Sequence, residues 1–274
     1  MKYQHAHHAG NFADVHKHIT LLVLLESLKR KDKGFFYLET HAGRGVYAAS
    51  SEARLGIERF MATAPAAPAA PDLAHYTQAI MAFRQSHGGA HSYPGSPWLA
   101  AQALRAQDRA VLVEIVPAQA RALEQAIASH SKVRVEQGDG FARLRAHLPP
   151  RERRGLLFID PPYEETRQDF ERVRTAVSEA LQRFETGMIA AWYPIKDESD
   201  TATWHALFKG SLGREALVSE LWLYPRDSRV GLNGSGVLIV NPPYLFAERA
   251  RDWLGELHGR LDAQGAGGFS VQAL

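Results

Sequence analysis

The chain has 274 residues, of which 45% are hydrophobic and 23% are charged, a composition typical of globular proteins. It contains no cysteine, which excludes disulfides and cysteine-based zinc or iron–sulfur sites. Its net charge of +2 favours an anionic partner only weakly. The apolar stretch at 19–25 is too short to span a bilayer and no signal peptide is evident, so we expect a cytoplasmic protein without membrane contact.

Short apolar segments of strand length recur along the chain, with helical stretches between them. The expected strands are 35–39, 110–115, 132–136, 155–160, 188–193, 217–223 and 236–241. The expected helices are 14–30, 97–107, 117–129, 167–184 and 245–263. This alternation predicts an α/β fold with a doubly wound, mostly parallel sheet of seven strands. Turn residues at 226–228 and 233–234 join the last two strands, which we expect to pair antiparallel.

One interval breaks the alternation. More than sixty residues separate the loop at 41–45 from the strand at 110, whereas a crossover needs roughly a dozen. The interval holds an Ala/Pro tract at 62–71, expected as an exposed loop, and a short helix expected at 73–85. We therefore predict a Rossmann-like domain formed by residues 1–49 and 96–274, with a small helical subdomain inserted at 50–95.

Basic residues concentrate in three short segments. They are Lys29, Arg30, Lys31 and Lys33, then Arg151, Arg153 and Arg154, then Arg226 and Arg229. Any one cluster is as compatible with solvated loop charge as with nucleic-acid contact. Because all three lie beside predicted strand ends, together they modestly favour nucleic acid.

Glycine and acidic residues follow the first three strands of the expected parallel sheet. The Gly-Arg-Gly turn at 43–45 allows close approach of a nucleoside, although one Gly-x-Gly is a weak indication. Glu114 closes the second strand, where a carboxylate can accept both ribose hydroxyls. Asp139-Gly140 follows the third strand, where the carboxylate can accept from an adenine amino group. Each also has a plainer interpretation, as an acidic strand end or an ordinary Asp-Gly turn.

The most informative segment is Asp160-Pro161-Pro162-Tyr163, which follows an apolar strand. Pro161 cannot donate to a sheet ladder, so the strand ends at Asp160. Open α/β sheets bind ligands at this carboxyl edge. The tetrapeptide offers a carboxylate, fixed carbonyls and a ring but no cation, and so it suits an amine-bearing planar ring better than a phosphate.

A near-copy of this motif, Asn241-Pro242-Pro243-Tyr244, follows the last apolar strand. Judged by its residue types alone, it is an equally good catalytic motif. That strand is expected to lie far from the cofactor edge and to run antiparallel, so here the prolines merely end a strand and start the terminal helix. We therefore place the catalytic site at 160–163.

The glycine turn, Glu114, Asp139 and the Asp-Pro-Pro-Tyr tetrapeptide follow four successive expected strands of the parallel sheet. This order of motifs resembles that of class I S-adenosylmethionine-dependent methyltransferases. Six motifs then occur in order: His-Ala-Gly-Asn-Phe-Ala-Asp-Val-His-Lys-His (8–18), Glu-Thr-His-Ala-Gly-Arg-Gly (39–45), Tyr-Pro-Gly-Ser-Pro (93–97), Asp-Gly-Phe (139–141), Ile-Asp-Pro-Pro-Tyr-Glu (159–164) and Trp-Tyr-Pro (192–194). With them the chain resembles, essentially end to end, the RlmJ family of bacterial 23S rRNA adenine-N6 methyltransferases, whose nomenclature places the target at adenine 2030. Two departures are Glu39, where aspartate is commoner, and His16, which replaces an apolar residue.

The resemblance implies S-adenosyl-L-methionine as methyl donor, S-adenosyl-L-homocysteine as product and 23S rRNA as partner. It implies cofactor contacts for His18, His41, Ser96, Glu114, Asp139, Gly140 and Asp160. It also implies that Tyr3 meets the RNA substrate. We expect a monomer.

The N-terminal segment is rich in histidine, which can indicate a metal site. His7 and His8 are adjacent, and His16 and His18 point to different helix faces, so no one-faced ligand set emerges. We expect no metal. Instead we expect this segment to dock onto the cofactor edge and to begin a helix.

The expected chemistry is methyl transfer to the exocyclic N6 of an extruded adenine. That nitrogen is a poor nucleophile, because its lone pair is delocalised into the ring. Hydrogen bonds from its N–H groups to Asp160 and to the Pro161 carbonyl would favour a more nucleophilic, tetrahedral nitrogen. Tyr163 can stack on the base, which is worth roughly 1–3 kcal/mol.

Three alternatives remain open from the residues alone. A DNA adenine-N6 methyltransferase would use the same tetrapeptide. A nucleic-acid-binding module could keep the fold without catalysis. A nicotinamide-dependent dehydrogenase is less favoured, because the full glycine fingerprint is missing.

Overall fold

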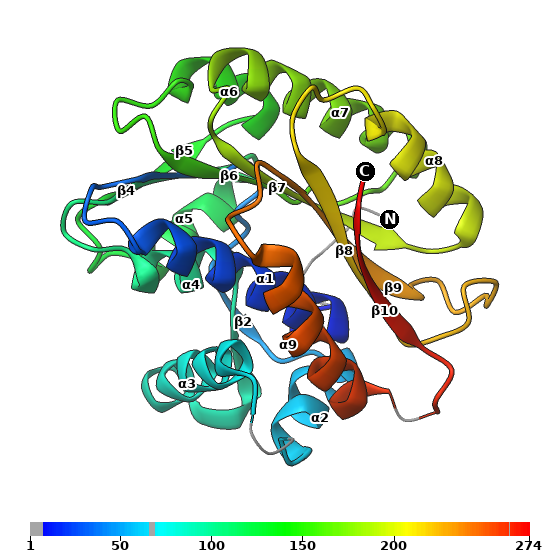
Figure 1. Ribbon diagram of the computed structural model, residues 1–274. Helices are drawn as coiled ribbons and strands as arrows, with labels where there is room; N and C mark the ends of the chain where they lie inside the picture. The colour runs from blue at the N-terminus through cyan, green and yellow to red at the C-terminus, as the bar shows by residue number, and fades with distance from the viewer. Residues whose placement is uncertain (1–7, 66–68, 263) are drawn as a thin grey trace. The chain divides into compact units, whose positions relative to one another are not determined.

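The computed structural model describes residues 8–65, 69–262 and 264–274, and within them ten strands form two sheets (Figure 1). The strands are β1 Phe36–Glu39, β2 Val46–Ala48, β3 Ser92–Pro94, β4 Arg109–Glu114, β5 Val133–Gln137, β6 Gly155–Ile159, β7 Met188–Ile195, β8 Ala216–Trp222, β9 Gly234–Val240 and β10 Gly268–Ala273. The main sheet has the order β10-β8-β9-β7-β6-β1-β4-β5, and β2 pairs with β3 separately.

Nine α-helices lie among the described residues. They are α1 Phe12–Lys29, α2 Ile57–Ala62, α3 Pro71–Ser86, α4 Ser96–Ala103, α5 Pro117–Ala126, α6 Gly140–His147, α7 Thr166–Arg183, α8 Glu198–Phe208 and α9 Phe246–Leu261. Two short 3-10 helices, η2 Ser51–Leu55 and η3 Gly89–His91, complete this part of the chain. None of these helices combines the length and the apolar character that crossing a membrane requires.

The chain divides into two compact units. Leu21–Tyr47 and Pro94–Ala191 form one, here called the parallel unit. The residues up to Thr20, Ala48–Tyr93 and Trp192–Leu274 form the other, here called the mixed unit. The chain passes from one unit to the other within α1, β2, β3 and β7.

The parallel unit is a doubly wound sheet. Strands β1, β4, β5 and β6 and the first half of β7 are all parallel to their neighbours. Every residue of β1 and β6 is buried, because α4 and α5 lie on one face of the strands and α6 and α7 on the other (Figure 1). Burying each large apolar side chain of this kind stabilises the fold by roughly 1.5–3 kcal/mol. The two-sided burial accounts for the continuous apolar runs in these strands.

The mixed unit is built around antiparallel strands. As predicted from the sequence, β8 pairs antiparallel with β9, and the register joins Ala216 to Val240 and Trp222 to Gly234. The other edge of β8 pairs antiparallel with β10. Helix α9 buries Trp253, Leu254 and Leu257 along one face.

The α/β class and the mostly parallel sheet predicted from the sequence are confirmed, and all seven expected strands are present. The predicted count of seven strands is wrong: among the described residues the main sheet has eight. The additional strand is β10, which follows the glycine-rich segment 265–268 and buries only Val271 of its six residues. A mostly exposed edge strand carries no apolar pattern from which it can be predicted.

Helix α2 and the short strands β2 and β3 were not expected individually from the sequence, and neither were the helices α6 and α8. Helix α6 begins at Gly140 and buries little besides Leu144. Helix α8 carries threonines at 201 and 203, which favour strands. Both helices begin at an aspartate whose carboxylate accepts backbone N–H groups, Asp139 for α6 and Asp197 for α8.

The tract expected as a loop at 62–71 is helical at both ends, because Ala62 ends α2 and Pro71 begins α3. Its described residues between these, 63–65 and 69–70, lack helix and strand and are exposed or half-exposed, as expected. The remainder of the tract between these two stretches lies outside the described residues. The inserted subdomain at 50–95 and the domain limits given with it stay predictions.

Candidate active site

Polar residues gather at the carboxyl edge of the parallel unit. Glu39 ends β1 and lies in register with Leu112 of β4 and Phe158 of β6. Glu114 ends β4, so it lies at the same edge of the sheet. Asp139 directly precedes α6 after β5, and Asp160 directly follows β6. Parallel pairing thus brings these strand-end carboxylates to one side of the unit.

Glu114 holds the glycine turn after β1. Its Oε2 accepts a hydrogen bond from the Gly43 N–H at 2.8 Å, and its Oε1 accepts from the Val116 N–H at 2.7 Å. Gly43 has a φ of +64°, and a Cβ there would lie 2.2 Å from the Tyr47 hydroxyl, so this position requires glycine. Each carboxylate oxygen keeps a further lone pair with which to accept a ligand hydroxyl.

Asp139 caps helix α6. Its Oδ1 accepts from the Phe141 N–H at 2.9 Å and from the Ala142 N–H at 3.4 Å. Its Oδ2 has no hydrogen-bond partner among the described residues. A Cβ on Gly140 would lie 1.9 Å from the Thr40 carbonyl oxygen, so only glycine allows this turn to approach β1 so closely. The interpretation of Asp139-Gly140 as an ordinary turn is therefore incomplete, because Asp139 also caps a helix.

His41 lies beside this cap as a neutral side chain. Its ring packs edge-on against Phe141, with centroids 4.8 Å apart, and its Nδ1 lies 2.7 Å from Thr40 Oγ1. Burial lowers the pKa of His41 to about 4, the Asp139 charge opposes that shift, and the Arg172 charge adds to it. The ring therefore carries no charge at neutral pH.

Ser96 and Glu39 are joined at the start of α4. The Ser96 hydroxyl donates to Glu39 Oε1 at 2.5 Å, and the Tyr37 hydroxyl donates to Glu39 Oε2 at 2.9 Å. Glu39 is fully buried. Burial and the Glu39 charge raise the pKa of Tyr37 well above its usual value, so Tyr37 remains a donor. This carboxylate positions Ser96, the residue predicted to meet the cofactor.

The tetrapeptide Asp160-Pro161-Pro162-Tyr163, predicted to be catalytic, leaves β6 at the same edge. Asp160 is half-buried and Pro161 is buried. Tyr163 has a φ of +48°, is only 4% exposed, and packs edge-on against Phe170 with centroids 5.8 Å apart. Burial, together with the Asp160 and Asp169 charges, raises the pKa of its hydroxyl well above the usual value. Stacking of a base on Tyr163 would require one face of this ring to become accessible.

One predicted site residue lies outside the parallel unit, and another is not among the described residues. His18 belongs to the mixed unit, where its Nδ1 lies 2.9 Å from the Tyr93 hydroxyl and its ring stacks on Tyr93 at 5.5 Å. Tyr3 lies outside the described residues. Their roles stay predictions, whereas the parallel unit brings together His41, Ser96, Glu114, Asp139, Gly140, Asp160, Pro161 and Tyr163.

The near-copy of the tetrapeptide has a different setting in the mixed unit. Asn241 follows β9, which is antiparallel to β8, and its φ is +52°. Tyr244 is 82% exposed, in contrast to the buried Tyr163. The assignment of the catalytic site to 160–163 stays a prediction, and these differences are consistent with it.

Sequence reasoning missed three contributors to the site. Thr40 contacts His41 through its hydroxyl, Phe141 supports the His41 ring, and the backbone N–H of Gly43 binds Glu114. Phe141 could have been found from the sequence, because it belongs to the Asp-Gly-Phe motif. A backbone N–H donor cannot be recognised from the sequence, because every residue except proline has one. Across residues 8–65, 69–262 and 264–274, no group of three or more His, Asp or Glu side chains is arranged to hold a metal ion.

Comparison with known proteins places the chain in a family. A family model described as ribosomal RNA large subunit methyltransferase D, RlmJ, matches residues 32–274. A protein from Haemophilus influenzae named ribosomal RNA large subunit methyltransferase J is 38% identical over 282 residues, covering 99% of this chain and 98% of its own. The Escherichia coli protein of the same name is 38% identical over 275 residues, with the same coverage.

A crystal structure of a Legionella pneumophila protein is also similar, with 36% identity and a TM-score of 0.87. The match covers 97% of this chain and 98% of that chain. These similarities run nearly end to end and confirm the resemblance seen in the sequence motifs. The chain therefore belongs to the RlmJ family of ribosomal RNA large subunit methyltransferases.

Proposed function

We propose that this protein transfers the methyl group of S-adenosylmethionine to the exocyclic N6 of an adenine in 23S rRNA, at the position the family nomenclature numbers 2030. The observation that carries the proposal is the placement of Asp160-Pro161-Pro162-Tyr163 at the carboxyl end of β6, on the sheet edge that also carries Glu114 and Asp139. Membership of a ribosomal RNA methyltransferase family supports the choice of RNA over DNA.

The polar groups of this edge suit S-adenosylmethionine. The strand ends offer carboxylates, and Glu114 and the free Oδ2 of Asp139 keep acceptor capacity for ribose hydroxyls and an adenine amino group. Neutral His41 adds an apolar ring wall, and Ser96 adds a hydroxyl oxygen. Acceptors and negative charge complement a ligand that bears a sulfonium and an ammonium. When bound, this group supplies an electrophilic methyl.

Asp160 and Pro161 orient the target nitrogen. In the proposal, the Asp160 carboxylate and the Pro161 carbonyl each accept one N–H of the adenine amino group, which draws the lone pair out of conjugation with the ring. The prolines fix these acceptors before the base arrives, so little reorganisation is needed during reaction. The Asp160 carboxylate also provides an acceptor for the proton that N6 must lose.

The remaining predicted roles belong to the same proposal. Tyr163 stacks on the extruded base once a ring face is accessible, His18 contacts the cofactor, and Tyr3 meets the RNA. The protein acts as a monomer in the bacterial cytoplasm, where ribosomal RNA is made and assembled. Extrusion of the base is cheapest at a single-stranded or loosely structured site.

An Asp160→Ala variant tests the proposal. Alanine removes the acceptor for one N–H of the adenine amino group, so methyl transfer at saturating substrates should fall by about 10²–10³-fold, a loss typical of one oriented hydrogen-bonding group. Circular dichroism and calorimetric titration with S-adenosylmethionine should show a folded protein that still binds its cofactor.

The matched control is Tyr244→Ala, which removes the exposed ring of the near-copy. This variant should keep normal turnover. Near-normal turnover of Asp160→Ala, or a large loss with Tyr244→Ala, would overturn the assignment of the catalytic site.

A further inference from the structure

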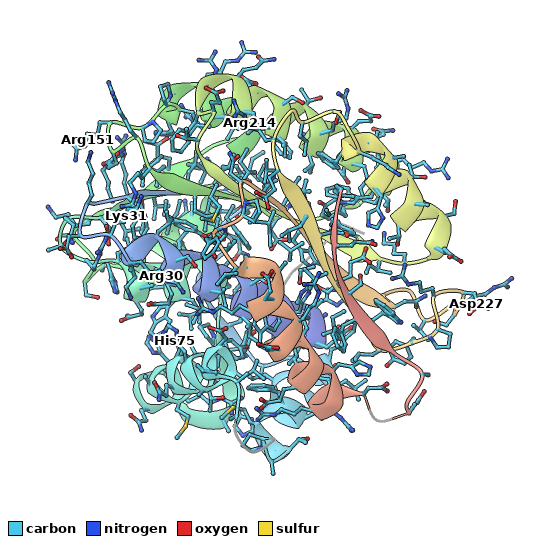
Figure 2. The ribbon with its side chains drawn as sticks, in the orientation of Figure 1. Arg30, Lys31, His75, Arg151, Arg214 and Asp227 are labelled. Atoms are coloured by element: carbon cyan, nitrogen blue, oxygen red, sulfur yellow. The ribbon has the colours of Figure 1, made fainter. Side chains whose placement is uncertain are left out.

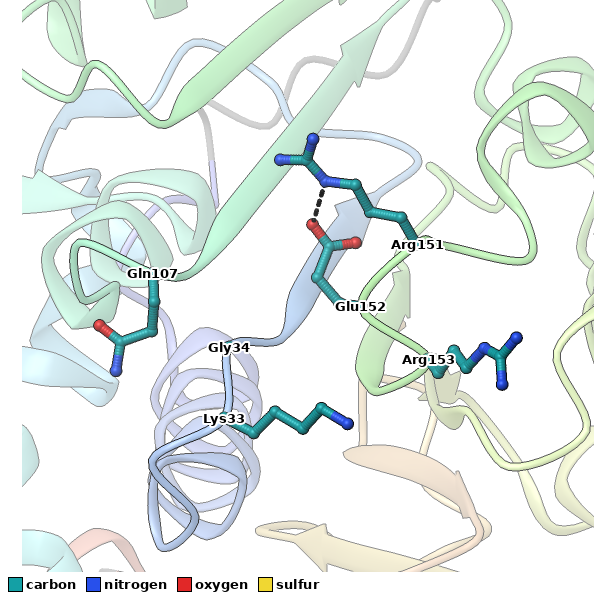
Figure 3. A pocket seen from close by; sticks show the side chains of 6 residues that line it. All are labelled: Lys33, Gly34, Gln107, Arg151, Glu152 and Arg153. Carbon is teal, nitrogen blue, oxygen red and sulfur yellow. Dashed lines mark hydrogen bonds and ion pairs between the residues drawn. The ribbon is translucent and has the colours of Figure 1, made fainter.

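A pocket lies at the opposite edge of the parallel unit, at the amino-terminal ends of its strands. It has a volume of about 480 Å³ and is lined by Lys33, Gly34, Gln107, Arg151, Glu152 and Arg153 (Figure 3). The lining segments directly precede β1, β4 and β6. A four-residue strand such as β1 is roughly 13 Å long, so this pocket is well separated from Glu114 and Asp160 at the carboxyl edge.

The segments around this pocket carry an excess of positive charge. Residues 26–34, 105–109 and 151–154 together contain nine lysines and arginines and four aspartates and glutamates. The whole chain has a net charge of only +2, so the rest of the molecule is net negative. The excess of positive over negative charge in this protein therefore lies at one edge of the parallel unit.

Two arginines of this region are used to hold the backbone of the turn after α1. Arg105 Nη1 donates to the carbonyls of Lys29 and Lys31, at 3.2 and 3.0 Å. Arg154 donates through Nη1 to the Lys33 carbonyl at 2.6 Å and through Nη2 to the Leu28 carbonyl at 2.8 Å. The turn that presents Arg30, Lys31 and Lys33 is thus held in one conformation.

Five other cations of these segments are exposed: Arg30, Lys31, Lys33, Arg151 and Arg153. Figure 2 shows Arg30, Lys31 and Arg151 on the same side of the view, and Figure 3 shows Lys33, Arg151 and Arg153 around the pocket. Lys33 and Arg153 are exposed, and their side chains make no ion pair or hydrogen bond with any other described residue. Arg151 pairs only with Glu152, which a second arginine, Arg109, already binds at 3.0 and 3.2 Å.

This arrangement adds little to the stability of the fold. Exposed ion pairs contribute only about 0–1 kcal/mol each, and cations fixed close together repel one another. A cluster of exposed cations that nearby carboxylates neutralise only in part is typical instead of a surface that binds an anion. Its cations come from separate segments and line an open concavity rather than a closed cavity, which suits an extended polyanion better than a small one.

We propose that this basic pocket binds the sugar–phosphate backbone of the RNA substrate at a place remote from the target adenine. The inference rests on the proposed function, because it takes RNA to be the substrate. Contacts with phosphates carry no base specificity, but they fix the orientation of the RNA on the protein. The pocket would thereby raise the affinity for a structured RNA large enough to reach both edges of the unit.

The test compares two triple variants of the full chain. One carries Lys33→Gln, Arg151→Gln and Arg153→Gln. The control carries Arg121→Gln, Lys209→Gln and Arg214→Gln, which removes three exposed cations elsewhere. Binding of a deproteinised 23S rRNA fragment is measured over a range of salt concentrations. Each lost phosphate contact reduces the logarithmic salt slope by about 0.7–0.9. The pocket variant should therefore lose about two units of slope and bind about tenfold or more weakly at 0.1 M salt, whereas the control should match the wild type.

Methylation kinetics separate this inference from the proposed function. The pocket variant should show a raised KM with unchanged kcat on the long fragment, and normal kinetics on a short oligomer that contains only the target site. If the wild type methylates the long fragment and the pocket variant matches the control in slope and KM, the pocket inference is wrong. If the wild type methylates no RNA, the proposed function itself fails. A loss that appears only on ribosomal particles, and not on deproteinised RNA, would point to an acidic protein partner and would also overturn the inference.

Discussion

At position 16, a histidine lies fully buried in α1, where the family resemblance led us to expect an apolar residue. Its Nδ1 lies 2.9 Å from Ser235 Oγ and its Nε2 lies 3.0 Å from Ser219 Oγ. A neutral imidazole has one donor and one acceptor, so two hydroxyls satisfy it completely. Burial lowers the pKa of His16 to about 3, and the Glu220 charge opposes the shift only in part. The residue is therefore a neutral polar core group.

This environment predicts a loss of stability in acid. Between pH 6.5, the ordinary pKa of histidine, and a folded-state pKa of about 3, the unfolded chain binds a proton at His16 and the folded chain does not. Acid therefore favours the unfolded state, by about 2 kcal/mol at pH 5. The free energy of unfolding of the wild type, measured relative to a His16→Gln variant in urea at pH 7.5 and pH 5, should fall by that amount. A difference that does not change with pH would show that His16 titrates normally.

At the scale of elements, one carboxylate at the start of α6 has both a structural role and a proposed role in cofactor binding. Asp139 Oδ1 caps the helix, while Oδ2 is the proposed acceptor for the cofactor. The helix begins at Gly140 with few apolar contacts of its own, so the cap matters for its stability. The two oxygens allow the two roles to be separated by substitution.

Asp139→Ser keeps a capping hydroxyl but removes the carboxylate. We expect its free energy of unfolding to stay within a few tenths of a kcal/mol of the wild type, while its affinity for S-adenosylmethionine falls about tenfold, the loss expected of one charged hydrogen bond. Asp139→Ala should lose about 1 kcal/mol of stability as well. Calorimetric titration and urea unfolding measure the two quantities independently.

The matched control for this prediction is Asp197→Ala. Asp197 caps α8 by accepting from the Asp200 N–H at 2.7 Å, and it belongs to the mixed unit. This variant should lose similar stability yet bind S-adenosylmethionine normally. If all three variants lost affinity in proportion to stability, the loss would reflect local unfolding rather than a missing cofactor contact.

At the scale of the whole molecule, the sequence predicted the elements that bury continuous apolar runs. All seven expected strands are present. Six of them lie in the interior of the main sheet, whereas β5 is an edge strand that alternates valine with polar residues. Pro161 and Pro242 mark the ends of β6 and β9 to within one residue. Strand β10 and helices α6 and α8 were missed because partners outside the segment stabilise them. Strand β10 depends on pairing with β8, and the two helices depend on carboxylate caps.

The candidate site was predictable in a similar way. Side chains at strand ends, such as Glu114, Asp139 and Asp160, were visible from position alone. The buried Glu39–Ser96 bond, the Gly43 N–H on Glu114 and the low exposure of Tyr163 were not, because each depends on contacts between segments distant in sequence. Outside the site, the interactions of Glu220 were unpredictable for the same reason. Its fully buried carboxylate binds side chains from several segments: Tyr193, His205, Arg226 and Ser270.

The measurement that tests the central claim most directly is the mapping of transferred label. The purified chain is incubated with S-adenosylmethionine labelled in its methyl group, together with deproteinised 23S rRNA or, in parallel, double-stranded DNA, and the modified nucleosides are then identified. The account predicts N6-methyladenosine at a single adenine of the rRNA and no label in the DNA. Label on DNA adenine, on another base, or on neither polymer would contradict it.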